Sequence, residues 1–231
     1  MTQFNDIGIS SRLDWPRIRK LLTIGLAASL LHTAGDMLLG WGVEDESLMG
    51  FSRMLSAYTG TSDGGILAAA WLGLFGMTLA GLSMFGIYRL MAERAPSCAH
   101  SFRSGIFGYL IFGVCGFHVS VCALVFLIKH GAEAALVETY IDYFLLPPLV
   151  LFWIFFLVLE AAQIRAFAKG LTPCPRWCWI FSLPVGMAAA QLPKLLGNHP
   201  LPNAIACAWI PLANLWMFAG LLAVTKRVQK K

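Results

Sequence analysis

An imidazole and a carboxylate lie four residues apart in the apolar segment LHTAGDMLLG, residues 31–40. At this spacing, His32 and Asp36 share one face of a helix. Both side chains can bind a metal ion, take a proton from water or carry a proton. Ionisable groups inside a membrane helix are costly, and they usually face a functional cavity. The pair therefore predicts a site for acid–base or metal chemistry.

Polar side chains on other apolar segments are predicted to lie at the same depth. If these helices leave the cytoplasmic boundary near residues 18, 104 and 177, His32, His118 and Gln191 lie about 21 Å along their axes, at 1.5 Å per residue. We therefore predict one polar chamber in the outer half of the bilayer, opening outward. Its candidate catalytic residues and metal ligands are His32, Asp36 and His118, and its candidate substrate-binding residues are Gln191, Lys194, Asn203, Cys122 and Asn214.

The composition sets the class of protein that must position these residues. Of the 231 residues, 58% are hydrophobic and 13% are charged, and the mean hydropathy is +0.70, which a soluble domain of this size does not show. We expect an all-α polytopic membrane helix bundle that forms one domain over residues 1–231. A transmembrane helix needs about 20 apolar residues. The six predicted transmembrane helices span roughly 18–41, 65–89, 103–129, 144–166, 177–196 and 203–225.

The distribution of charge predicts the orientation of the chain. Of the 17 Lys and Arg residues, 14 flank the spans on one side, whereas Arg53, Lys129 and Lys194 fall on the other. Because positively charged flanks stay in the cytoplasm, both termini are predicted to be cytoplasmic. The net charge of +5 arises from these anchoring residues, so we expect no nucleic-acid partner.

Two connections on the outer side carry helical patterns of apolar residues. Residues 47–58 and 133–144 each place apolar side chains three or four positions apart. We predict two amphipathic outer-surface helices, lying on the outer face of the bilayer. They either seal the bundle against lipid or cover the polar chamber as a lid.

The segment GDMLL, residues 35–39 and preceded by Ser29-Leu30-Leu31, resembles the membrane-embedded GDxLL motif of the lysoplasmalogenase family. The resemblance implies hydrolysis of a lysolipid ether with Asp36 in an intramembrane catalytic role. The chain as a whole resembles the uncharacterised six-span membrane families of bacteria, which implies the bacterial inner membrane as its location.

Three functions fit the predicted chamber. The first is a lipid or lysolipid hydrolase with membrane lipids as partners, in which a divalent metal is the candidate cofactor. The second is a small-solute or proton-coupled transporter or binding protein, with His32 and Asp36 carrying a proton. The third is a haem protein with His32 and His118 as axial ligands. The sequence does not determine the oligomeric state.

Overall fold

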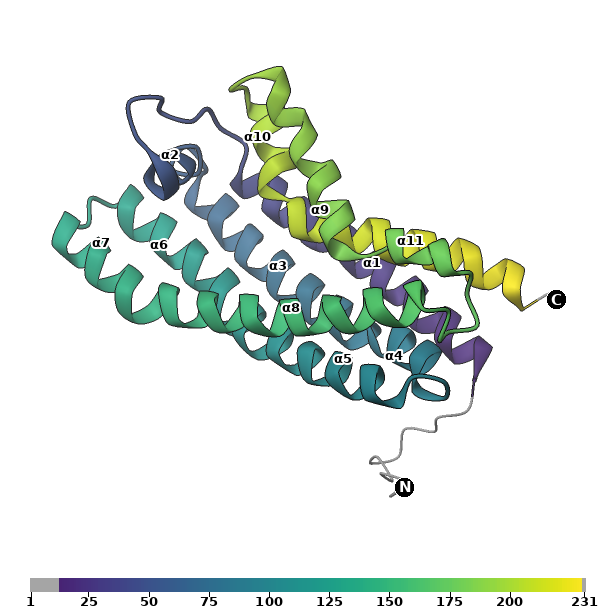
Figure 1. Ribbon diagram of the computed structural model, residues 1–231. Coiled ribbons are helices and arrows are strands. Elements are labelled where there is room, and N and C mark those ends of the chain that lie inside the picture. Colours follow the sequence, from purple (N-terminus) through teal and green to yellow (C-terminus); the bar gives the residue numbers. More distant parts are fainter. Residues whose placement is uncertain (1–12, 230–231) are drawn as a thin grey trace.

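The computed structural model describes residues 13–229, and the regular secondary structure of this part of the chain consists of helices alone (Figure 1). The all-α prediction is therefore confirmed. The helices in chain order are α1 (Trp15–Leu39), α2 (Gly50–Ser56), α3 (Asp63–Ser83), α4 (Phe85–Ala92), α5 (Pro96–Gly108), η1 (Tyr109–His118), α6 (Val119–Lys129), α7 (Ala134–Tyr140), η2 (Ile141–Leu145), α8 (Leu146–Ala168), η3 (Arg176–Ile180), α9 (Leu183–Gln191), η4 (Leu192–Leu196), α10 (Pro200–Cys207) and α11 (Trp209–Val228). The elements η1 and η2 are π-helical, and η3 and η4 are 3₁₀ turns.

Within residues 13–229, five helices are long and apolar enough to cross a membrane, so the chain is a multi-pass membrane protein. They are Trp15–Leu39, Asp63–Ala92, Pro96–Lys129, Ala134–Ala168 and Trp209–Val228. The prediction of six continuous spans is wrong at residues 177–196, where η3, α9 and η4 replace one helix. Pro184 and Pro193 lie in the first turns of α9 and η4. Because proline lacks a backbone N–H and clashes with the preceding turn, each helix starts anew there.

The two predicted outer helices differ in outcome. Residues 47–58 contain the separate short helix α2, as predicted. The second prediction is wrong in its boundary, because α7 runs through η2 into α8 as one continuous helix, Ala134–Ala168. Pro147 and Pro148 follow η2 directly, and the wider π turn leaves room for rings that would clash with the carbonyl groups of a regular α-turn.

The packing order brings the ends of distant segments together. The first helix, α1, packs between α3 and α11, while α5 and η1 pack against α8 and η1 also contacts α3. The helix α9 packs on α11, and α10 lies beside α1. At the end of the bundle where α2, α7 and α10 lie, the segments around α9 and α10 rise away from α6 and α8 (Figure 1). The candidate site lies toward this end.

Both ends of the described chain lie at the opposite end of the bundle from α2 and α10 (Figure 1). The guanidinium of Arg19 donates to the side-chain oxygen of Gln229 at 3.3 Å, which ties the start of α1 to the end of α11. This arrangement agrees with termini on one side of the membrane, while the choice of the cytoplasmic side stays a prediction from charge.

Candidate functional site

Three ionisable side chains from two helical segments converge inside the bundle, as the sequence predicted. His32 and Asp36 come from α1, and His118 is the last residue of η1. The Nε2 atom of His32 lies 3.4 Å from Oδ2 of Asp36, and Nδ1 of His118 lies 3.6 Å from Oδ1 of the same carboxylate. His32 is 2% exposed and His118 is 8% exposed, so the carboxylate links two buried imidazoles.

A backbone carbonyl fixes the orientation of His118. Its Nε2 atom lies 3.2 Å from the carbonyl oxygen of Ala69 on α3. A carbonyl oxygen only accepts hydrogen bonds, so Nε2 carries the hydrogen in this contact. In a neutral imidazole, Nδ1 then presents a lone pair to the Asp36 carboxylate. The π-helical segment η1 ends at this residue, and such wide turns are frequent at functional sites.

Small residues on α3 make room for the cluster. A Cβ atom added at Gly73 would overlap the His118 ring, so only glycine leaves space for it. A Cβ atom at Gly76 would lie 2.7 Å from the backbone nitrogen of His32 and 2.8 Å from the carbonyl oxygen of Ala28. These glycines let the backbones of α1 and α3 approach closely, as small residues do in membrane helices. The sequence therefore specifies the cluster partly through the helix opposite it.

The cluster forms the inner wall of a cavity of about 370 Å³. Asp36 and His118 line the cavity, and His32 lies behind them. Aromatic side chains provide much of the remaining wall: Phe51, Tyr58, Phe117, Trp153 and Trp209. The indoles of Trp153 and Trp209 pack with ring centroids 5.8 Å apart. The cavity therefore offers a largely apolar surface with a few polar groups, which is typical of small-molecule sites.

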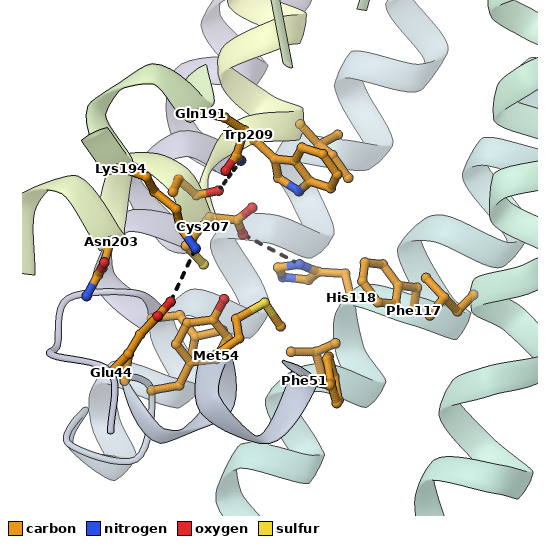
Figure 2. Close-up of a pocket in the computed structure, with 18 of the residues that line it drawn as sticks. Glu44, Phe51, Met54, Phe117, His118, Gln191, Lys194, Asn203, Cys207 and Trp209 are labelled. Atoms are coloured by element: carbon orange, nitrogen blue, oxygen red, sulfur yellow. Dashed lines mark hydrogen bonds and ion pairs between the residues drawn. The ribbon is translucent and has the colours of Figure 1, made fainter. Parts of the chain in front are cut away.

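An ion-pair bridge lies at the cavity wall nearest the outer loops (Figure 2). Glu44 accepts from Lys194 Nζ at 3.2 Å with one carboxylate oxygen and from Arg53 Nε at 3.0 Å with the other. Asn198 strengthens the bridge, because its side chain accepts from the Glu44 backbone N–H at 2.8 Å and donates to the Glu44 carbonyl at 2.7 Å. Asn203 donates both to Asn198 and to the carbonyl of residue 42. These contacts hold the loop after α1 against η4 and α10.

The structure separates the five predicted substrate-binding residues into two groups. Gln191, Lys194 and Asn203 line the cavity, with Gln191 donating to the carbonyl of residue 206 at 3.1 Å. Cys122 and Asn214 are buried but do not line it. Cys122 belongs to an apolar core cluster, and Asn214 donates to the hydroxyl of Tyr109 at 3.0 Å. Helical spacing placed these two on polar stripes, but neighbouring helices cover those stretches.

The two imidazoles do not face each other as axial ligands of a haem would. Their rings lie edge to face with centroids 5.3 Å apart, and both contact Asp36. A porphyrin would have to lie between His32 and His118, where this carboxylate lies. The geometry therefore does not support the haem hypothesis.

Sequence reasoning missed three contributors to the cavity. Glu44 was counted only as an outer acidic residue, although an acid close to Arg53 in sequence was a usable signal. Tyr58 was assigned to an amphipathic helix, yet it is 5% exposed and hydrogen-bonded to Cys207. Burial raises the pKa of Tyr58 well above its ordinary value of 10.0, so its hydroxyl stays protonated and can donate a hydrogen bond. Trp209 lies just after the break between α10 and α11, which the sequence did not predict.

The fold and the site define a multi-pass helical membrane protein with a buried histidine–aspartate cluster beside a cavity. The chain matches the model of a family described as a family of unknown function, DUF6796, over residues 4–228, and it belongs to that family. No curated protein and no solved structure matches it. Nothing in these comparisons ties the GDMLL segment to lysoplasmalogenases.

Proposed function

We propose that this protein is a membrane-embedded hydrolase that acts on a lipid or lysolipid of the outer leaflet. One observation carries the proposal: the Asp36 carboxylate and the Nδ1 atom of His118 lie 3.6 Å apart on the wall of a largely apolar cavity. Two basic groups so placed can bind one water molecule and accept its proton.

The proposed reaction is attack of water on the carbonyl carbon of an ester linkage. The Asp36 and His118 pair takes one proton from the water, and the resulting hydroxide adds to the electrophilic carbon of the substrate. Negative charge then develops on the oxygen bound to that carbon, and we assign the protonated hydroxyl of Tyr58 in the cavity wall as a donor to it. When the linkage breaks, the departing oxygen receives the proton that the pair took from water, which restores the site.

The cavity walls support an amphiphilic substrate. Aromatic and aliphatic side chains suit an alkyl chain or a glycerol backbone, and the polar groups lie together around Glu44, Lys194 and Asn203. These three residues belong to the end of the bundle that carries the outer loops, so we assign them to the head group. We further propose the bacterial inner membrane as the location and its lipids as the partners.

Turnover of lipids by the purified protein tests the proposal. Diacyl phospholipids, lysophospholipids and their ether analogues are incubated with the protein in detergent micelles, and products are identified by mass spectrometry. Asp36→Asn is expected to reduce any turnover at least about 100-fold, the scale of a lost acid–base group. Asp63→Asn is the matched control, because Asp63 is an exposed acid at the same end of the bundle and pairs with Lys129 and His130. Turnover that Asp36→Asn leaves unchanged would refute the assignment.

Proton-coupled transport of a small solute is the second candidate. The observation that favours it is a series of buried polar atoms without a hydrogen-bond partner, which includes Nδ1 of His32, Oδ1 of Asn214 and Oε1 of Glu160. Such groups mark proton pathways in membrane proteins. Uptake into proteoliposomes that depends on a pH gradient and leaves the solute chemically unchanged would favour this function over hydrolysis.

A further inference from the structure

We infer that His32, Asp36 and His118 form a binding site for one divalent transition-metal ion, with zinc as the ion that fits best. One ligand atom from each residue can be chosen such that all three lie within 4.8 Å of one another. The inference deepens the proposed function, because the ion would lower the pKa of the attacking water, with Asp36 and His118 as its ligands in place of the proton acceptors of the metal-free scheme. Only the role of the ion in activating water rests on the proposed function, because metal binding itself is measured without substrate.

The hydrogen bond to Ala69 provides the first argument. It places the hydrogen of His118 on Nε2, so Nδ1 directs a lone pair at the Asp36 carboxylate. A lone pair facing a carboxylate oxygen at 3.6 Å is repulsive, and a proton or a metal ion between the two atoms relieves the repulsion. A metal ion does so without protonating a ring that is only 8% exposed. A backbone carbonyl bonded to the second nitrogen is also the usual support of a metal-binding histidine.

The distances provide the second argument. Zinc binds histidine nitrogen and carboxylate oxygen at about 2.0 to 2.1 Å in tetrahedral geometry, which separates neighbouring ligand atoms by about 3.3 Å. The separations in the cluster, 3.4 Å from His32 Nε2 to Asp36 Oδ2 and 3.6 Å from His118 Nδ1 to Asp36 Oδ1, are close to that value. Because they run to the two different oxygens of the carboxylate, rotation of the three side chains, whose ligand atoms lie within 4.8 Å of one another, would complete the arrangement around one ion.

The ligand set and its surroundings indicate the type of metal. Two imidazoles and one carboxylate are donors that zinc accepts at catalytic sites, where three protein ligands leave the fourth position for water. Magnesium and calcium prefer a shell made of oxygen atoms, which this cluster does not provide. Asp36 and His118 line the cavity whereas His32 lies behind them, so the fourth position faces the space that we assign to the substrate.

Cobalt and zinc binding to the purified full-length chain tests the inference. The protein in detergent is stripped with a chelator and titrated with Co²⁺, followed by its visible absorption, and Zn²⁺ is then added in competition. We expect about one ion per chain, a spectrum of a tetrahedral centre, and displacement by zinc. Asp36→Asn and His118→Gln are each expected to weaken binding more than about 100-fold, beyond the effect of losing an outer-shell partner.

Two matched controls separate loss of the site from loss of the fold. His130→Gln removes the histidine of the exposed His130–Asp63 pair, which has the same chemistry without a second imidazole, and it should bind metal as the wild type does. Gly73→Ala keeps all three ligands but displaces His118, and it should lose affinity, whereas Gly64→Ala on the same helix meets open space and should retain it.

The outcomes are decisive for the metal site whatever the activity. Wild-type protein that binds neither ion, or stoichiometric binding that survives both Asp36→Asn and His118→Gln, would overturn the inference. Metal binding without lipid turnover would support the metal site and refute the hydrolase. Turnover by the metal-free protein would support the hydrolase and refute the ion as the activator of water, while the titration alone decides whether the site binds metal.

Discussion

Replacing Gly76 by alanine should open the site while all three of its ionisable side chains keep their identity. The new Cβ atom would lie 2.7 Å from the backbone nitrogen of His32, whereas ordinary contacts begin at 3.4 Å. Both atoms belong to helix backbones, so α1 and α3 must separate by the difference, about 0.7 Å. Because Asp36 moves with α1 while Ala69 holds His118 to α3, the distance from Asp36 to His118 should grow from 3.6 Å to about 4.3 Å.

This separation should weaken metal binding and cost stability. Overpacking of this kind typically costs about 1 to 3 kcal/mol. Two measurements in detergent check the prediction, namely thermal unfolding and the Co²⁺ titration. Gly64→Ala is the control, since a Cβ atom there meets no heavy atom within 4 Å and a glycine-to-alanine change in open helix is neutral or stabilising. If Gly76→Ala bound metal as tightly as Gly64→Ala, the close approach of α1 and α3 would not be what shapes the site.

Three other substitutions have defined outcomes. Glu160→Ala should lower the free energy of unfolding by about 1 to 3 kcal/mol, because a backbone N–H of α9 loses its buried acceptor. Glu160→Gln keeps an acceptor and should cost less, and the exposed control Glu138→Ala should change stability little in the same thermal assay. Asn198→Ala should make the loop after α1 more sensitive to limited proteolysis, because it removes the two hydrogen bonds to the backbone of Glu44. The control His199→Ala changes an exposed neighbour and should leave the loop protected, so equal cleavage of both variants would contradict the role of the bridge. The pKa of Tyr58 is raised in the folded state, so above pH 10 this hydroxyl ionises more readily in the unfolded chain and the stability of the fold decreases. Tyr58→Phe should make this decrease smaller in unfolding measurements across this pH range.

The sequence predicted most of the architecture because membrane spans depend on a simple physical requirement. About 20 apolar residues are needed to cross the hydrocarbon core, and the segments around α1, α3, α5, α8 and α11 meet it in any packing. The segment 177–196 also meets it in composition, yet Pro184 and Pro193 divide it into short helices. Composition alone does not say whether a proline kinks a helix or ends it. The outcome depends on whether neighbouring segments form hydrogen bonds with the backbone groups that the proline leaves without a partner.

The core of the site was predictable from depth, as were the wall residues Gln191, Lys194 and Asn203, whereas the rest of the wall was not. His32 and His118 were level by helical rise alone, with Asp36 one turn further along the same face of its helix, and the three side chains do converge. Depth does not say which face of a helix is covered, so Cys122 and Asn214 were assigned to the chamber although they lie in packed regions outside it.

The rest of the site depends on tertiary contacts that sequence spacing does not encode. Glu44 reaches Lys194 across 150 residues of chain, and the close fit of Gly73 to His118 joins two helices. A local pattern shows an acid in a loop and a glycine in a helix, each of which is common without any such role.

An experimental structure of the zinc-loaded protein, with anomalous scattering measured at the zinc edge, tests the central claim most directly. The account predicts one strong anomalous peak between Nε2 of His32, the carboxylate of Asp36 and Nδ1 of His118, facing the cavity. A structure in which the two imidazoles point away from Asp36, or a peak located only elsewhere, would contradict it.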